Sequence, residues 1–315
     1  MTIDAVLLTS FGGPEGPDDV LPFLENVTRG RDVPRARLEV VASHYLEHFG
    51  GVSPLNAQCR QLQAALQAAL PELPVYWGNR NWHPYLADTM RTMQADGVTH
   101  ALAVVTSAFP SYSGCRQYQE DLAAAGPLPV SKLRHYYAED GFLEPMRRNT
   151  EAACEGLRNP RLVFTAHSVP VSMAVASGPD GGAYEQTLRL AAARVAGDRP
   201  WDLVWQSRSG PPQVPWLEPD VGDHLLALHD QGTREVVVVP LGFTSDHVEV
   251  VFDLDVQLRA QLPDDLVLKR AATVGTDPQF VAMLAGLVRE RINGVPAPQG
   301  IALQDVCPPG CCLAR

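Results

Sequence analysis

Eight short apolar runs, rich in β-branched residues, recur along the chain. They lie at residues 4–11, 74–79, 100–107, 130–136, 161–168, 202–207, 235–243 and 265–272. Runs of this kind are typical of strands that are buried on both faces of a parallel sheet. Between most of them lie amphipathic segments of helical length, such as 54–70 and 84–97. Strands that alternate with helices predict right-handed βαβ units and parallel sheets.

The order of these elements divides into two similar halves. Four of the expected strands precede residue 140 and four follow residue 160. We therefore predict an α/β fold with two Rossmann-like lobes, each a four-stranded parallel sheet flanked by helices, at 1–150 and 151–295. A Pro- and Gly-rich tail follows at 296–315. Ligands of such folds bind outside the carboxyl ends of the strands, so two lobes with facing strand exits would enclose a cleft.

Composition narrows the class of partner and the compartment. The 315 residues are 45% hydrophobic and 19% charged, as is normal for a folded protein, and the net charge of −11 disfavours nucleic acid or an anionic membrane as a partner. The first residues lack a basic n-region and a cleavage site, and no apolar run approaches the ~18 residues that span a bilayer. We expect a cytoplasmic protein without membrane insertion, in which cysteines stay reduced.

A histidine and three acids follow two of the runs in the second half. His167 closes the fifth run, and Asp246, Glu249 and Asp253 follow the seventh at spacings i, i+3 and i+7. Ser245 or Asp246 would cap a helix there. In the simplest interpretation the histidine is structural and the acids suit the positive end of that helix, which accounts poorly for Asp253. Imidazole with carboxylates also suits a divalent metal that is held transiently, and it suits a general base.

Aromatic and basic residues indicate the kind of ligand. Aromatic residues at or near the expected strand exits are Phe11, Trp77, Trp82, Tyr112, Trp205 and Trp216. A core position is the default for Trp205, whereas Trp216 follows a Pro-rich loop of the kind that runs over the surface. Large flat aromatics around a cleft suit a large flat apolar ligand. One polar segment carries Arg29, Arg31, Arg35 and Arg37, which form either a solvated loop or a site for carboxylates.

Longer strings resemble those of one enzyme family. The chain resembles ferrochelatases, in the same order over almost its whole length, in "SFGGPEG", "HFGGVSPLN", "TAHSVP", "VWQSRSGPPQVPWLEP" and "GFTSDHVEVVFDLD". The resemblance implies two Rossmann-like lobes around a porphyrin cleft and the insertion of ferrous iron into a porphyrin in heme biosynthesis. It is greatest to the bacterial branch whose substrate is coproporphyrin III.

The resemblance also implies roles for single residues. His167 is the catalytic histidine and Glu249 is its partner carboxylate, while His247 belongs to the same signature. Asp253 matches the next rung of an acidic ladder that leads metal or protons away, and the rung after it is replaced here by Gln257. The expected metal-contacting residues are His167, Glu249, Asp246 and Asp253.

The porphyrin-binding residues that the resemblance implies are Phe11, Arg29, Arg31, Tyr45, Ser53 and Trp216. Phe11 stands where some ferrochelatases carry a tyrosine that can bind the iron, so this position offers the metal no oxygen. The basic segment around Arg29 stands where membrane-associated members carry an apolar lip. Charge matching therefore favours coproporphyrin III, with four carboxylates, over protoporphyrin IX, with two, and the product would be coproheme.

Other functions fit parts of these patterns. A protoporphyrin IX ferrochelatase is the first alternative. A non-catalytic tetrapyrrole carrier would need the aromatics and arginines but not His167 with Glu249. A cobalt chelatase of the same fold is disfavoured by "VWQSRSGPPQVPW", and a periplasmic-type binding protein by the missing signal peptide. The ferrochelatase function implies porphyrin and ferrous iron as substrates and allows a transient contact with the next enzyme of heme synthesis.

Three of the six cysteines lie close together in the tail, at Cys307, Cys311 and Cys312. Some ferrochelatases carry a [2Fe–2S] cluster on three cysteines of a C-terminal extension and one of the body, so the resemblance implies such a cluster here. For the fourth ligand we prefer Cys154, on a helix expected at the lobe boundary; Cys115 is the rival. Cys59 is expected within a helix. A zinc site and an unliganded tail are the alternatives.

Overall fold

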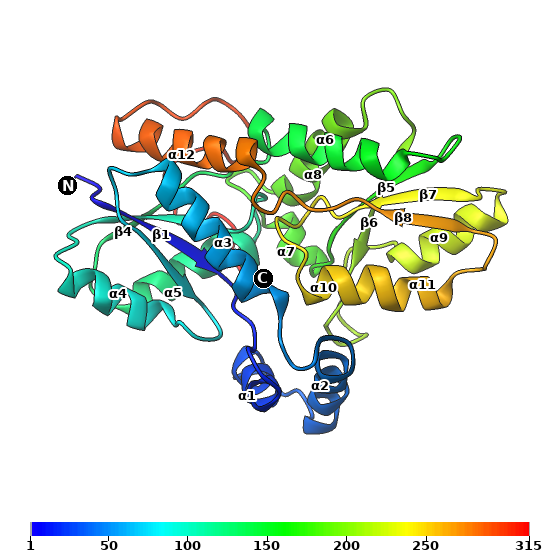
Figure 1. Cartoon of the computed structure of the whole chain (residues 1–315), viewed down its shortest axis with the longest axis horizontal. Helices are drawn as coiled ribbons and strands as arrows, with labels where there is room; N and C mark the ends of the chain where they lie inside the picture. Colours follow the sequence, from blue (N-terminus) through cyan, green and yellow to red (C-terminus); the bar gives the residue numbers. More distant parts are fainter. Residues whose placement is uncertain (1, 315) are drawn as a thin grey trace. The chain divides into compact units, whose positions relative to one another are not determined.

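The computed structural model describes residues 2–314, which form two compact units. The first unit runs to Thr106 and resumes at Tyr118–Lys132; the second takes Ser107–Gln117 and the described residues from Leu133 on. Each unit is built on one four-stranded parallel sheet flanked by helices (Figure 1). The predicted α/β fold is confirmed, and a strand coincides with at least half of each of seven apolar runs and with the first three residues of the run at 130–136.

The sheet of the first unit has the strand order β2-β1-β3-β4. Its strands are β1 (Ala5–Ser10), β2 (Val75–Asn79), β3 (Ala101–Val105) and β4 (Val130–Lys132). Every residue of β1 and β3 is buried, which explains why these runs are almost wholly apolar. One face packs against α4 (Leu86–Ala95) and α5 (Gln117–Ala125), and α3 (Pro54–Ala69) packs on β2.

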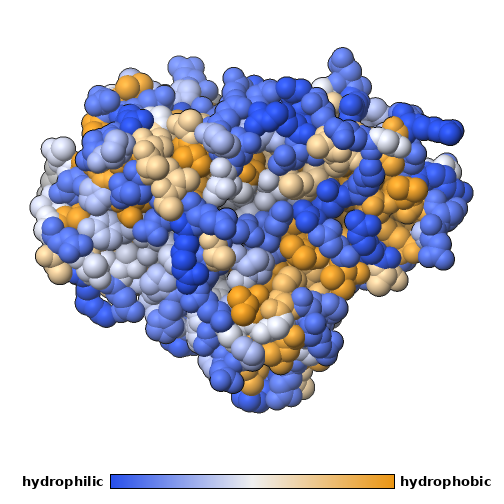
Figure 2. Space-filling view, viewed as in Figure 1, coloured by the Kyte–Doolittle hydropathy of each residue, from blue (hydrophilic) through white to orange (hydrophobic). Residues whose placement is uncertain are grey.

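Two further helices of the first unit form a hairpin with a small core of its own. They are α1 (Pro17–Val27) and α2 (Arg35–Phe49), and the segment between them carries Arg29 and Arg31. Phe23 of α1 and Leu38 of α2 are buried in this core, and Trp82 packs against it. Exposed apolar side chains lie among charged ones on α2, so its surface has a mixed polarity (Figure 2).

The second unit repeats the pattern, with the strand order β6-β5-β7-β8. Its strands are β5 (Arg161–His167), β6 (Trp201–Gln206), β7 (Glu235–Val239) and β8 (Val267–Arg270). One face packs against α6 (Asp140–Cys154) and α8 (Ala183–Ala196), and α12 (Pro278–Ile292) lies on α6. The other face packs against α9 (Val221–Asp230) and a continuous helical stretch made of α10 (Val248–Val250), η2 (Val251–Gln257) and α11 (Leu258–Gln261).

The boundary between the units differs from the one expected near residue 150. Because α6 packs against α8 and α12, all of it belongs to the second unit. The chain changes units after Lys132, where β4 ends after three residues, so the strand expected at 130–136 is shorter than predicted. The described tail residues, 296–314, contain no regular helix or strand. Between residues 2 and 314, no helix combines the length and the apolar character needed to cross a bilayer.

Candidate active site and thiol site

The carboxyl end of β5 carries the candidate histidine. β5 lies between β6 and β7, so the strand order reverses at β5 and β7, where ligands of such sheets bind. His167 is the last residue of β5, and the segment after β7 returns against it, because the Gly242 N–H donates to the Thr165 carbonyl at 3.0 Å. A Cβ at position 242 would lie 2.6 Å from the Cβ of Ala166. Gly242 therefore allows the segment that leads to Glu249 to approach His167.

His167 and Glu249 face each other as an ion pair. The Nε2 of His167 lies 3.7 Å from the Oε1 of Glu249, and the two side chains are 31% and 50% exposed. The Nδ1–H donates to the Ser168 carbonyl, which leaves Nε2 for the carboxylate. Burial lowers the pKa of His167, but the Glu249 carboxylate and the Ser168 carbonyl outweigh it and raise the pKa overall. Desolvation also opposes the charge on Glu249, yet the positive charge on His167 holds the pKa of Glu249 at about 2.

Asp253 lies next to this pair in the π-helical turn η2. Burial raises its pKa to about 7, and the negative charge of Glu249 acts in the same direction. The Ser207 hydroxyl donates to the Asp253 carboxylate, and Ser207 has φ of 60°, a strained value for a residue with a side chain. Gln206 donates to the Glu249 carbonyl at 2.8 Å. Gln206 and Ser207, at the exit of β6, thus position both acids. The sequence offered no signal for Gln206 and Ser207 beyond their place at a strand exit.

Asp246 is bound by Arg270. Its Oδ1 accepts from the Arg270 Nη1 at 3.0 Å, and the same guanidinium donates from Nε to both carboxylate oxygens of Asp255 at 2.9 Å. The prediction that Ser245 or Asp246 caps the helix is therefore wrong. The helix begins after His247 and has no side-chain cap, because the Asp246 carboxylate is engaged elsewhere.

The expected four-residue metal set is not gathered around one point. Desolvation lowers the pKa of His247, whose ring packs edge-on against Phe243 with ring centroids 5.2 Å apart. In the described part of the chain, no three His, Cys, Asp or Glu side chains are arranged to hold a single ion. The geometry brings together His167 and Glu249, with Asp253 beside them, whereas Asp246 contributes charge through its pair with Arg270.

In the first unit, Phe11 follows β1 and is 39% exposed. Its ring centroid lies 5.9 Å from the guanidinium carbon of Arg80, which also lies 4.6 Å from the ring centroid of Tyr118. The Arg80 side chain is buried and pairs with Asp121. A buried cation therefore lies within cation–π distance of the Phe11 ring. Arg80 directly follows β2, and no pattern in the sequence predicted its contact with Phe11.

The other first-unit residues expected to bind porphyrin differ in availability. Arg29 and Arg31 are exposed, and among the described residues no carboxylate forms an ion pair with either. Tyr45 is half-buried with its ring 6.1 Å from that of Phe23. Ser53 is buried, and its hydroxyl oxygen accepts from a backbone N–H as the N-cap of α3. Arg29 and Arg31 are thus the groups best placed for carboxylates of a ligand.

Trp216 lies in the second unit beside the segment that follows His167. Pro170 and Trp216 form an isolated antiparallel bridge, and the Leu217 N–H donates to the Val169 carbonyl at 3.0 Å. A Cβ at Gly210 would lie 2.3 Å from the Trp216 indole, so this glycine allows the ring to pack against the loop. The half-buried indole is therefore fixed next to the exit of β5.

Four cysteine side chains gather in the second unit. Cys307, Cys311 and Cys312 come from the tail, and Cys115 comes from the π-helical turn η1 (Tyr112–Arg116). Three of them are at most 2% exposed, and the Sγ atoms of Cys311 and Cys312 lie 3.7 Å apart. The Gly178 N–H donates to the Cys312 Sγ at 3.1 Å. The thiols form a row in which Cys115 neighbours Cys312, Cys312 neighbours Cys311, and Cys311 neighbours Cys307.

The structure places the rival candidate Cys115, and not the preferred Cys154, beside the tail cysteines. Cys154 ends α6 and its Sγ accepts from Arg199 at 3.0 Å. Cys59 lies buried in α3 of the first unit, where burial raises its pKa to about 11. Contact with Cys307 raises the pKa of Cys311, and contact with Cys115 raises that of Cys312 to about 11.

Comparison with known proteins shows which family and which relatives the chain is similar to. Residues 3–292 match the family model described as ferrochelatase. The chain is 58% identical to the "Coproporphyrin III ferrochelatase" of Frankia alni over 92% of this chain and 80% of that protein. It is 50% identical to the protein of the same name from Nocardia farcinica over 100% and 98%. A "Ferrochelatase" from Rhodopirellula baltica is 49% identical over 98% and 93%.

Among solved structures, the chain superposes on "The structure of CbiX, the terminal Enzyme for Biosynthesis of Siroheme in Denitrifying Bacteria" with a TM-score of 0.54. The sequence identity is 16%, over 90% of this chain and 98% of that one, and this likeness supports the fold alone. The family match spans nearly all of both units, and relatives at about half identity cover almost the full length. The chain therefore belongs to the ferrochelatase family.

Proposed function

We propose that this chain is an enzyme that inserts ferrous iron into coproporphyrin III and so forms coproheme for heme biosynthesis. The observation that carries the proposal is the His167–Glu249 pair at the exit of β5, because insertion must remove the two pyrrole N–H protons of the porphyrin. The names of the Frankia alni and Nocardia farcinica relatives support the choice of substrate. A protoporphyrin IX ferrochelatase and a non-catalytic tetrapyrrole carrier are the other outcomes that the assay below distinguishes.

His167 is the proposed base. Its Nδ1–H is held by the Ser168 carbonyl, so the neutral imidazole presents the lone pair of Nε2. Once protonated, the ring is stabilised by the carboxylate of Glu249, which a pKa of about 2 keeps charged. Fe²⁺ is a substrate in this scheme. His167 and Glu249 are the side chains proposed to contact it first, and Asp253 beside them is proposed as a later contact. Asp246 adds negative charge from its pair with Arg270.

Each unit is proposed to offer porphyrin contacts of its own. In the first unit, Arg29 and Arg31 would bind its carboxylates, because no carboxylate of the described chain pairs with them, and Phe11 would contact the macrocycle. Tyr45 and Ser53 complete this set, although the hydroxyl oxygen of Ser53 already caps a helix. In the second unit, Trp216 offers a flat apolar surface beside the exit of β5.

We further propose that the thiol site holds a [2Fe–2S] cluster on Cys115, Cys307, Cys311 and Cys312. Four cysteine thiolates are the ligand set of such a cluster, and here three come from the tail and one from η1. A zinc site on the same four thiolates is the alternative. When bound, the cluster would join the tail covalently to η1. No step of iron insertion uses it, because insertion transfers no electrons.

Anaerobic metal insertion, followed through the porphyrin spectrum, tests the enzyme proposal. The purified protein is given Fe²⁺ with coproporphyrin III and, separately, with protoporphyrin IX. Rapid conversion of coproporphyrin III alone is expected. Faster conversion of protoporphyrin IX would keep the enzyme and reject the charge matching by Arg29 and Arg31. Tight binding of both without turnover would identify a carrier.

The colour of anaerobically purified protein tests the cluster. We expect visible absorption that bleaches on reduction, together with equal amounts of iron and acid-labile sulfide. Cys115→Ser should abolish the absorption, whereas Cys154→Ser should retain it. A colourless preparation that contains zinc would support the zinc alternative, and a metal-free one would support an unliganded tail.

The proposal also covers the setting of the reaction. All six cysteines are free thiols, which suits the reducing cytoplasm. We propose a cytoplasmic enzyme that binds neither nucleic acid nor a membrane and hands its product on through a transient contact with the next enzyme of heme synthesis. Recovery of the activity in the membrane fraction of lysed cells at physiological ionic strength would contradict this part.

A further inference from the structure

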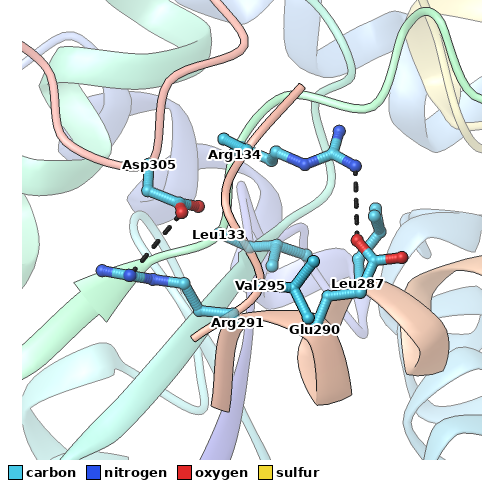
Figure 3. A pocket seen from close by; sticks show the side chains of 8 residues that line it. Leu133, Arg134, Leu287, Glu290, Arg291, Val295 and Asp305 are labelled. Atoms are coloured by element: carbon cyan, nitrogen blue, oxygen red, sulfur yellow. Dashed lines mark ion pairs between the residues drawn. The ribbon is translucent and has the colours of Figure 1, made fainter. Parts of the chain in front are cut away.

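The tail is attached to the second unit by contacts that involve no thiol. The Tyr137 hydroxyl donates to the Ile301 carbonyl at 2.9 Å, and Arg291 of α12 pairs with Asp305 at 3.6 Å (Figure 3). The cavity beside this pair has a volume of about 10 Å³, enough for no more than a water molecule. Ala302 and Leu303 are buried. These contacts hold the tail on the second unit at residues that directly precede its cysteines.

Arg116 holds the turn from which the last two cysteines project. Its Nε donates to the Cys311 carbonyl at 2.6 Å, and its Nη2 donates to the carbonyls of Pro309 at 2.6 Å and Pro308 at 3.4 Å. The Cys311 N–H closes the turn on the Pro308 carbonyl at 3.0 Å. Cys312 follows with φ of 54°, a left-handed conformation that is strained for a residue with a side chain. The guanidinium opposes the opening of this strained turn.

Arg116, which holds the tail turn, and Cys115, the fourth thiol, come from one tightly packed element. Cys115 and Arg116 are adjacent in η1, so one side chain enters the row of thiols while the next reaches the tail backbone. The turn is fixed at its start, because the Ser111 oxygen accepts from the Gly114 N–H at 2.9 Å. A Cβ at Gly114 would lie 2.4 Å from the Ser107 Oγ, which shows how closely η1 is packed.

Arginine suits this place for a geometric reason. Its planar guanidinium carries five N–H donors in a fixed fork, so one side chain can serve several carbonyls of a turn at once. Within the turn the Cys311 N–H donates to the Pro308 carbonyl, and Pro308 and Pro309 have no N–H to donate. Arg116 supplies donors to the Pro309 and Cys311 carbonyls. A lysine at position 116 would place a single ammonium group where three carbonyls now converge.

We propose that Arg116 is the positioning residue of the thiol site and brings the tail cysteines to Cys115 before any metal group binds. The inference rests on the proposed function only in its purpose, which is to keep four thiols assembled for a cluster. The geometry that it predicts is that of the metal-free protein.

The test measures the reactivity of each cysteine in the reduced, metal-free, full-length protein. A pulse of a thiol-alkylating reagent is followed by mass spectrometry of the peptides. In Arg116→Gln we expect alkylation of Cys311 and Cys312 to accelerate about tenfold or more, because charged hydrogen bonds to three carbonyls are lost. Arg116→Lys should lie between this variant and the wild type. Cys59, buried in the first unit, should stay slow throughout.

Arg147→Gln is the matched control, because Arg147 is also in the second unit but pairs with Glu144 and Glu151 on α6. Its cysteines should react as in the wild type. Unchanged rates for Cys311 and Cys312 in Arg116→Gln would overturn the inference. So would an equal acceleration of Cys59, which would indicate general unfolding. Reconstitution of the wild type with Fe²⁺ and sulfide is scored separately. If the wild type stays colourless while the tail cysteines of Arg116→Gln are alkylated faster, the cluster is rejected and the positioning role of Arg116 stands.

Discussion

His167 is constrained at three of its atoms. Its Nδ1–H donates to the Ser168 carbonyl, its own carbonyl accepts from the Tyr184 hydroxyl at 2.9 Å, and its Nε2 faces Glu249. The ring of Tyr184 is in turn packed 5.8 Å from that of Trp205 in β6. A side chain held in this way has one nitrogen committed and one directed to the carboxylate, which is the arrangement that a base with a defined tautomer requires.

His167→Ala is expected to lower iron insertion by about 10²–10⁴-fold, the usual contribution of a positioned base, while porphyrin binding persists. The binding surfaces assigned to Arg29, Arg31 and Phe11 are untouched by this change. Anaerobic turnover and the shift of the porphyrin spectrum on binding are measured on the same preparation. Substantial residual turnover would contradict the role of His167, and loss of binding would show that the variant is damaged more widely.

Asp202 is a second charged residue, and its contacts bear on stability and not on the reaction. Asp202, near the amino end of β6, accepts two hydrogen bonds of 2.7 Å from Arg161 of β5 and lies 3.1 Å from His224. Burial opposes its ionisation, but the hydrogen bonds from Arg161 and the nearby imidazole of His224 outweigh it and lower the pKa of Asp202 overall. This pair therefore ties β5 to β6 at the end opposite to His167.

Asp202→Asn is expected to lower the free energy of unfolding of the second unit by about 1–2 kcal/mol at pH 7. The folded pKa lies below the unfolded value of about 3.9, so the stabilisation is complete above that value and is lost as the pH falls through the folded pKa. Urea unfolding followed by tryptophan fluorescence at pH 7 and near pH 3 checks this. An equal difference between variant and wild type at both pH values would contradict the assignment.

At the scale of elements, both π-helical turns of the second unit carry proposed site residues. η1 supplies Cys115 and Arg116, and η2 supplies Asp253. A π-helix bonds residue i to i+5, so its turn is wider than that of an α-helix, and such turns are rare and concentrate at functional sites. In η2 the wide turn holds Asp253 where the Ser207 hydroxyl after β6 can reach it.

The close approach of Gly242 to β5 predicts a loss of activity on enlargement. In Gly242→Ala the new Cβ would meet Ala166, the neighbour of His167, at 2.6 Å, and relief requires the segment that leads to Glu249 to move. We expect a slower insertion rate and a loss of about 1–3 kcal/mol of stability, as in other overpacked sites. The measurements are kcat and the urea midpoint.

Gly286→Ala is the control for this change. Gly286 lies within α12, and nothing stands within 4 Å of the Cβ that alanine would add. Alanine should be neutral or stabilise by up to about 1 kcal/mol, because glycine is a poor helix residue. Normal kcat in Gly242→Ala would show that this approach does not position the pair, and a comparable loss in Gly286→Ala would show that the assay reports general damage.

The strands were predictable because buried parallel strands require apolar runs, and each run left a visible trace in the sequence. The helix start at His247 was not, because Arg270, which binds Asp246, comes from β8 and no local pattern announces that pair. For the same reason the sequence could name Cys115 only as the rival of Cys154: the fold carries η1 to the tail, whereas Cys154 was preferred for an expected boundary that the structure does not have. Hydrophobic periodicity and helix-cap patterns are local, so they could not predict contacts between residues that are distant in the chain.

Because the whole molecule is negatively charged, an anionic ligand depends on exposed arginines to bind. The chain has a net charge of −11, so an anionic porphyrin approaches against the overall field unless a local basic group offsets it. Arg35 cannot fill this role well, because it pairs with Glu25 at 2.7 Å and with Glu39 at 3.2 Å. Arg29 and Arg31, in the segment between α1 and α2, are exposed and are the better candidates.

The double variant Arg29→Gln and Arg31→Gln is therefore expected to raise KM for coproporphyrin III about tenfold or more, with a smaller rise for protoporphyrin IX, because the first substrate offers more carboxylates to the lost charges. The kcat should change little, since His167 and Glu249 are untouched. Higher ionic strength should weaken coproporphyrin binding in the wild type and less so in the variant.

Arg35→Gln is the control and should resemble the wild type, because Glu25 and Glu39 already engage that guanidinium. Equal losses for the two porphyrins, or a comparable loss in the control, would mean that this segment supports the hairpin of α1 and α2 and does not select the substrate.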